Sequence, residues 1–132
     1  MRQQTKDPAT LRKHLRMMLD EVNDLCWRIA DSDPMVQGSF YCVFKTCSKK
    51  NCRCQKGHRH GPFPALSQSI NGKRKLVMVK QEDADTVRVK AAAYKQFQKR
   101  LTRLRRSMAS METILQDIRS LLLEEYPCKD RS

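Results

Sequence analysis

The hydrophobic pattern of this chain of 132 residues changes its period twice, and the two changes divide it into three segments. Segments 1–34 and 82–132 place apolar residues every three or four positions, which is the period of an α-helix. Segment 35–81 instead alternates polar and apolar residues over short runs, as strands do. The pattern predicts an α+β fold, a small three-stranded antiparallel ribbon inserted between an N-terminal helix and a long C-terminal helix, all within one structural unit.

The first helix should begin at Pro8. Asp7 can cap the free amides of the first turn, and proline fits the first helical position. An apolar stripe follows and ends before Pro34, since proline disfavours helical backbone in the residue before it. Cys26 lies beside this stripe and is expected in the core.

The C-terminal stripe is longer and more regular than the N-terminal one. From Tyr94 to Leu122, apolar residues alternate at spacings of three and four, a coiled-coil pattern. The helix should start near Glu82, run for roughly 42 residues at 1.5 Å each, and stop at Pro127. Because the first stripe is only about half as long, the first helix can cover only part of the second. We expect the remainder to pair with a second copy in a homodimer; packing on the ribbon within one chain is the alternative.

The middle segment reads as three short strands. Residues 40–44 alternate in the manner of a strand, and two further strands are predicted over residues 64–70 and 73–79. Asn71-Gly72 joins them, because both residues accept the positive φ angles of a two-residue hairpin turn. Such a ribbon contains few large apolar residues, so a cross-link such as a metal site, or a helix packed against it, is needed to stabilise it.

Closely spaced cysteines and histidines supply a candidate metal site that could stabilise the ribbon. The pattern C-x4-C-x-C-x5-H offers three thiolates and one imidazole, a closed tetrahedral set typical of structural zinc. A closed set leaves no coordination position for hydrolytic chemistry. We assign the ligands as Cys47, Cys52, Cys54 and His60 and the cofactor as Zn²⁺; an iron–sulfur centre or a redox-sensing thiol set is the alternative.

Other cysteines and a histidine compete for this role. Cys42 shares a strand face with two phenylalanines, which favours a small core residue. His58 lies in the same short loop as His60, but Gly61-Pro62 directly follows His60 and predicts a sharp turn that would fix its side chain. Cys128 falls in the C-terminal tail and is expected to be a free thiol.

Charge is segregated as strongly as hydropathy. The whole chain carries +13, yet residues 45–106 alone carry +15, from 18 Lys and Arg against 3 Asp and Glu. Residues 34–81 contain no acid. This segregation indicates a polyanionic partner, nucleic acid first. A lysine-rich surface kept only for solubility would not need to exclude acids over so long a stretch.

Two basic elements could meet phosphates. The loop and hairpin offer Lys45, Lys49, Lys50, Arg53, Lys56, Arg59, Lys73, Arg74 and Lys75, and the long helix offers Lys95, Lys99, Arg100, Arg103, Arg105 and Arg106. The heptad stripe continues through the helical cations, so we expect this helix to lie along a phosphate backbone and not to enter the major groove alone. Tyr41 and Phe63 could stack on a base, although we favour core packing for both.

The middle segment also resembles a known family. The resemblance rests on Gly38-Ser39, Cys47, Cys52-Arg53-Cys54, Gly57, His60-Gly61-Pro62, Leu66-Ser67 and Asn71-Gly72-Lys73, and covers roughly residues 38–100. It is to an uncharacterised family of small bacterial and phage-borne proteins with a C-x4-C-x-C…HGP motif, a hairpin and a long C-terminal helix. Genes of that family often lie near transposases and other mobile-element genes. The resemblance implies the same four ligands and a mobile-element setting, and it supplies no activity.

These observations predict a zinc-stabilised nucleic-acid-binding protein, with DNA favoured over RNA. It would act as an accessory or regulatory factor of a mobile element, contacting mainly phosphates. The alternative is a coiled-coil adaptor that docks a protein such as a transposase or recombinase. We expect no enzymatic activity, because paired carboxylates, a nucleophile motif and a phosphate-binding glycine loop are all missing. Without a long apolar run or a signal peptide, we expect a cytoplasmic, nucleoid-associated protein with no membrane partner.

Overall fold

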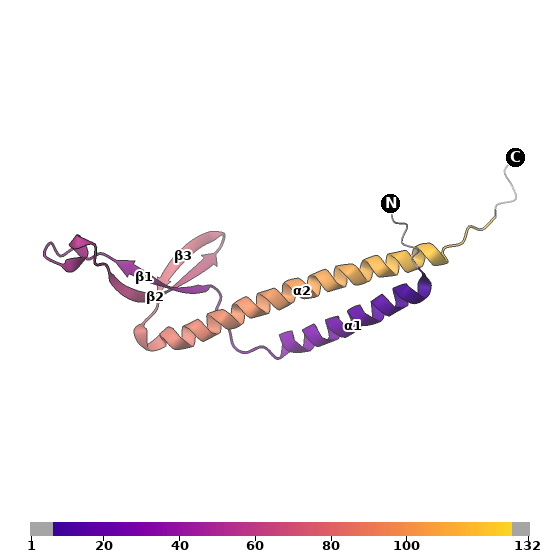
Figure 1. Cartoon of the computed structure of the whole chain (residues 1–132), viewed down its shortest axis with the longest axis horizontal. Helices are drawn as coiled ribbons and strands as arrows, with labels where there is room; N and C mark the ends of the chain where they lie inside the picture. Colours follow the sequence, from indigo (N-terminus) through magenta and orange to yellow (C-terminus); the bar gives the residue numbers. More distant parts are fainter. Residues whose placement is uncertain (1–6, 128–132) are drawn as a thin grey trace. The chain divides into compact units, whose positions relative to one another are not determined.

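A computed structural model describes residues 7–127. Its elements are α1 (Pro8–Ala30), β1 (Ser39–Lys45), the short 3-10 helix η1 (Arg53–Lys56), β2 (His60–Ile70), β3 (Lys73–Met78), the 3-10 turn η2 (Gln81–Asp83) and α2 (Ala84–Leu122) (Figure 1). The predicted α+β fold is confirmed: an N-terminal helix, a three-stranded antiparallel sheet and a long C-terminal helix.

The contacts divide these elements into two compact units. Asp31–Lys99 forms the first, which we call the sheet unit. The helical segments on either side, up to Ala30 and from Arg100 onward, form the second, the helix unit. α2 is continuous through both. Within the described residues, no helix is long and apolar enough to cross a membrane.

In the helix unit, α1 lies beside the second half of α2 (Figure 1). α1 begins where the sequence predicts, with the Leu11 amide donating to the carbonyl of Asp7 at 3.0 Å. Leu11 and Leu25 are buried on one face of α1. Cys26 was expected in this core, but it is exposed. It follows Leu25 by about 100° around the helix, so it lies on a different face from the buried leucine.

The long helix has the expected start and length. η2 leads directly into α2, which has 39 residues and ends at Leu122, so the two together give the expected helix of about 42 residues. It ends shortly before Pro127. The reason is the reach of the proline ring, which in a continuing helix would clash with the carbonyl four residues earlier, that of Leu123. The helix therefore has to end before the proline is reached.

The sheet has the order β1-β2-β3, with antiparallel neighbours. Asn71 and Gly72 form the predicted turn, with φ angles of 51° and 77°. β2 is longer than predicted, since it starts at His60 and not at residue 64. The extra residues pair with the end of β1 through an irregular register, Val43 opposite Phe63 and Lys45 opposite His60.

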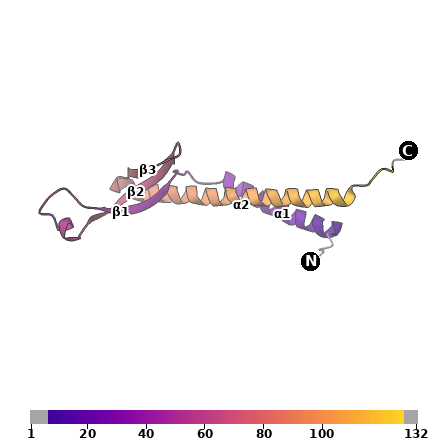
Figure 2. The same ribbon diagram turned by 90° about the horizontal axis from the view of Figure 1, so that it is seen from above.

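The core of the sheet unit lies where the start of β1 meets α2. Leu66, which pairs with Phe40, and Ala91 of α2 are buried there, and Phe40 lines a pocket with Ala91 and a neighbouring alanine of α2. Ala65 is also buried, on the other face of the sheet. Figure 2 shows the sheet along the first turns of this helix. Cys42 was expected in this core, but it is exposed. It lies farther along an edge strand that shares a pocket with α2 only near its first residues.

Candidate metal centre

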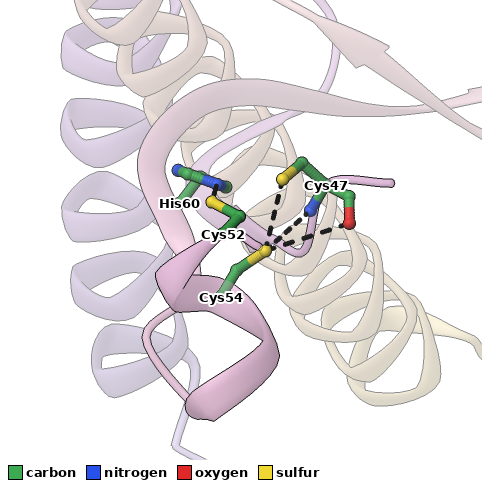
Figure 3. Close-up of side chains that lie close together, drawn as sticks. All are labelled: Cys47, Cys52, Cys54 and His60. Carbon is green, nitrogen blue, oxygen red and sulfur yellow. Dashed lines mark hydrogen bonds between the residues drawn. The ribbon is translucent and has the colours of Figure 1, made fainter. Parts of the chain in front are cut away.

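The connection between β1 and β2 gathers the four residues that the sequence singled out. Donor atoms of Cys47, Cys52, Cys54 and His60 all lie within 4.8 Å of one another (Figure 3). The Sγ atoms of Cys47 and Cys54 are 3.3 Å apart, and Sγ of Cys52 lies 2.9 Å from Nε2 of His60. Donor atoms around a tetrahedral zinc ion are separated by about 3.5–3.8 Å. The four side chains therefore fit around one metal ion after small adjustments.

The cysteines are held by the loop backbone as well as by one another. The amide of Cys47 donates to Sγ of Cys54 at 3.2 Å, and Nε2 of Gln55 donates to the carbonyl of Cys47 at 3.2 Å. Cys54 lies in η1 and is only 3% exposed. Gly57 ends η1 with a φ of 96°, a conformation that glycine adopts without strain. Sequence reasoning missed the role of Gln55, which carries no motif that would indicate it.

A β-bulge positions the histidine. Between the pairs Val43–Phe63 and Lys45–His60, β2 contains one residue more than β1. Gly61 occupies this bulge with a φ of 137°, and a Cβ atom there would lie 2.8 Å from the carbonyl oxygen of Val43. Bulges of this kind redirect the neighbouring side chain. The expected sharp turn at Gly61-Pro62 is therefore wrong, because both residues belong to β2.

The choice between the two histidines is settled by the same geometry. His60 joins the cluster, whereas His58 is exposed and lies outside it. Cys42 and Cys26 also lie outside the cluster within the described residues. Cys128 falls outside the described residues. The predicted set of four is thus brought together without a substitute.

Hydrogen bonds differentiate the thiols. The Cys54 amide is the main cause that lowers the pKa of Cys52 to about 6, and a hydrogen bond with the Cys47 side chain adds to it. The pKa of Cys47 is raised, chiefly by its hydrogen bond to the Cys54 side chain. At neutral pH the Cys52 thiolate therefore predominates, and a thiolate is the form that binds metals.

The predicted phosphate-binding cations form two clusters. Six lie in or next to the loop that holds the metal site and are all exposed: Lys45, Lys49, Lys50, Arg53, Lys56 and Arg59 (the loop cluster). Lys73, Arg74 and Lys75 flank the β2–β3 turn and are also exposed (the turn cluster). The two clusters lie at opposite ends of β2, whose 11 residues span about 33 Å. The sequence treated them as one basic element, and the structure separates them.

The helical cations differ among themselves. Lys95, Lys99, Arg105 and Arg106 are exposed, and Arg100 is half-buried. Arg103 was expected to be free for phosphates, but its Nε lies 2.7 Å from Oε1 of Glu21 on α1. Tyr41 and Phe63 were expected in the core; Tyr41 is instead 42% exposed, and Phe63 is half-buried.

One comparison with known proteins bears on the chain. A model of a domain of unknown function, DUF6788, matches residues 11–89, which include most of α1, the metal cluster, the whole sheet and the start of α2. No curated protein and no solved structure matches the chain significantly. Since the match covers more than half of the residues, the chain belongs to the DUF6788 family.

Proposed function

We propose that this protein binds Zn²⁺ through Cys47, Cys52, Cys54 and His60 and uses the metal-held loop to bind nucleic acid, DNA in preference to RNA. It would contact mainly phosphates, act as an accessory or regulatory factor of a mobile element, and have no catalytic role. The observation that carries the proposal is the set of six exposed cations in and next to the loop that holds the metal cluster, in a segment without a single acid.

Zinc suits the donor set better than other metals do. Three thiolates and an imidazole in a closed arrangement are typical of structural zinc sites. With all three thiols deprotonated, the site would carry a net charge of about −1, which the surrounding lysines and arginines stabilise. Metal analysis of the purified protein should find about one zinc ion per chain.

The positions of the cations favour a polyphosphate partner. None of the nine residues of the loop and turn clusters pairs with an acid within residues 7–127. A loop fixed by a metal presents its cations with little further loss of conformational entropy on binding. The spacing of about 33 Å between the two clusters is close to one turn of duplex DNA, about 34–36 Å. Both clusters could therefore reach one face of the same duplex.

Salt dependence and charge reversal test this proposal. If about six phosphates are neutralised, log affinity should fall against log salt concentration with a slope near −5. Reversing Lys49, Arg53 and Lys56 to Glu should weaken duplex binding by more than about tenfold and reduce the slope by roughly 3. The matched control reverses Arg12, Lys13 and Arg16, three exposed cations of α1. Equal losses in both variants, or a wild-type slope shallower than about −2, would contradict the proposal.

An exposed stripe on α2 supports the homodimer, although it lies in the half of α2 beside α1 and not in the first half, which packs along the sheet. Met108, Leu115 and Leu122 are spaced by seven residues and are 53%, 50% and 69% exposed. A second copy packed antiparallel about Leu115 would cover all three and place Glu112 of each copy beside Arg119 of the other, giving two ion pairs. Sedimentation should show a dimer.

A matched pair of variants tests this seam. Leu115→Asp should dissociate the dimer, because it places a charge at the centre of the stripe. Leu121→Asp should not, because Leu121 is exposed on another face of α2. A monomeric wild-type protein would contradict the dimer.

The same stripe gives the adaptor hypothesis its support. In that case, the occupant would be another protein such as a transposase or recombinase, and the charge-reversal variant of the loop would still capture it. Loss of nucleic-acid binding together with retained capture through the stripe would favour the adaptor.

A further inference from the structure

A hollow of about 440 Å³ lies beside the metal cluster. Lys45, Lys49 and Phe63 line it together with Thr46 and three of the cluster residues. Its volume falls within the range of about 300–1,000 Å³ in which proteins hold small ligands. No sequence pattern indicates this hollow, because it depends on the bulge at the start of β2.

The aromatic wall of the hollow continues along the sheet. Phe63 pairs with Val43, and the next pair on the same face is Tyr41 with Ala65, which is in turn opposite Met78. Tyr41 and Met78 are each 42% exposed. Tyr41 and Phe63 are diagonal neighbours, roughly 7–8 Å apart. Two aromatic rings therefore follow one another from the hollow onto an accessible face.

The opposite face of the sheet packs against α2. Phe40 points to that face, because side chains alternate along a strand, and it lines a pocket with Ala91 and Ala92 of α2. On the face with Tyr41, Ala65 is fully buried between its neighbours, Tyr41 is 42% exposed and Phe63 is half-buried. Part of each aromatic ring is thus accessible to a ligand.

Charge and aromatic surface together define the ligand class. Lys45 ends β1 and Lys49 lies in the loop, both exposed, so two lysines line the hollow together with the ring of Phe63. Base–aromatic stacking combined with a cationic path for the backbone is how proteins bind unpaired strands. Paired bases inside a duplex do not expose their faces and cannot stack in this way.

We propose that the hollow binds an unpaired nucleotide, with its base stacked on Phe63, its flanking phosphates at Lys45 and Lys49, and the next base on Tyr41. This inference rests on the proposed nucleic-acid binding and specifies the form of nucleic acid that the sheet unit takes. The preferred target is a single-stranded segment, or a duplex that carries one.

Oligonucleotides with and without bases test the inference. The zinc-loaded full-length protein is titrated by fluorescence anisotropy with a twelve-nucleotide oligothymidylate and with an abasic strand of the same length, which keeps the phosphates. We expect the strand with bases to bind at least about fivefold more tightly. Phe63→Leu should abolish this difference, whereas Phe44→Leu, at an exposed phenylalanine that does not line the hollow, should keep it. Zinc content and helicity are measured for each variant.

The outcomes separate the two proposals. Equal affinity of the wild-type protein for the two strands overturns the stacking site. This test uses no variant, so misfolding of a variant cannot explain its result. If the duplex still binds in that case, the proposed function stands. Failure to bind duplex, single strand and abasic strand at low salt overturns both. An oligouridylate of the same length then decides whether unpaired RNA is taken as well as unpaired DNA.

Discussion

The metal loop and the pair formed by α1 and α2 are stabilised by different kinds of interaction. The loop between β1 and β2 buries one side chain, that of Cys54, and no large apolar residue. The helix unit buries Leu11 and Leu25 and needs only the correct spacing of apolar residues to do so. In the loop, the chemistry of four donor atoms takes the place of a hydrophobic core. Substitutions should therefore have local and distinct consequences in the two regions.

The largest expected effect comes from removing the metal. Structural zinc contributes about 10–16 kcal/mol in isolated zinc-finger peptides, as much as the whole stability of a typical domain, about 5–15 kcal/mol. Chelation, or the variant Cys54→Ser, should open the loop and expose Lys49 and Lys56 to trypsin. Helicity measured by circular dichroism should persist, because the apolar contacts of α1 do not involve the loop.

The control for the metal is Cys42→Ser, at an exposed cysteine outside the cluster. It should retain zinc and resist trypsin as the wild-type protein does. Complete loss of helicity on chelation would contradict the comparison, because the helices would then depend on the metal.

The second effect should appear only in the helix unit. Leu25→Ala removes a buried side chain and should lower the free energy of unfolding by about 2–4 kcal/mol. Zinc affinity, measured by competition with a chelating dye, should not change. Met17→Ala, at an exposed position on the same helix, should cost less than about 0.5 kcal/mol. A fall in zinc affinity for Leu25→Ala would show that the two regions are coupled.

The third effect compares two glycines of the metal region. Gly57 and Gly61 both have positive φ angles, so alanine is strained by about 1–2 kcal/mol at either position. Only at Gly61 would the new Cβ meet backbone, at 2.8 Å from the carbonyl of Val43; at Gly57 nothing lies within 4 Å. Gly61→Ala should therefore weaken zinc binding by more than Gly57→Ala, by about tenfold or more. Equal losses would mean that the bulge does not position His60.

Much of the site could be predicted from local spacing. The ligand set follows from the side chains alone, because three thiols and an imidazole so close in sequence can reach one ion whatever path the loop takes. The sequence favours His60 over His58 because Gly61-Pro62 follows it, and His60 does join the cluster, although the backbone there is a bulge and not a turn. Both conformations satisfy the same local requirement, a glycine with unusual backbone angles.

Burial could not be predicted in the same way. Cys26, Cys42 and Tyr41 were all placed in the core, and all three are exposed. Periodicity shows which residues share a face, but it does not show whether another element covers that face. The separation of the loop and turn clusters could not be predicted either, because it depends on the full length of β2. The first residues of β2 contain a Gly-Pro pair, which in the sequence resembles a turn.

The smallest expected effect concerns an ion pair between α1 and α2. Arg103 and Glu21 meet at 2.7 Å, but their side chains are 70% and 26% exposed, so solvent screens much of the attraction. A double-mutant cycle with Arg103→Ala and Glu21→Ala should give a coupling of about 0.2–1 kcal/mol, reduced further in 1 M salt. The pair Arg28 and Asp24, which lies within α1, is the control and should give about 0.3–0.5 kcal/mol. A coupling above about 2 kcal/mol would contradict the view that apolar spacing holds these helices together, because a charge pair would then contribute as much as a buried leucine.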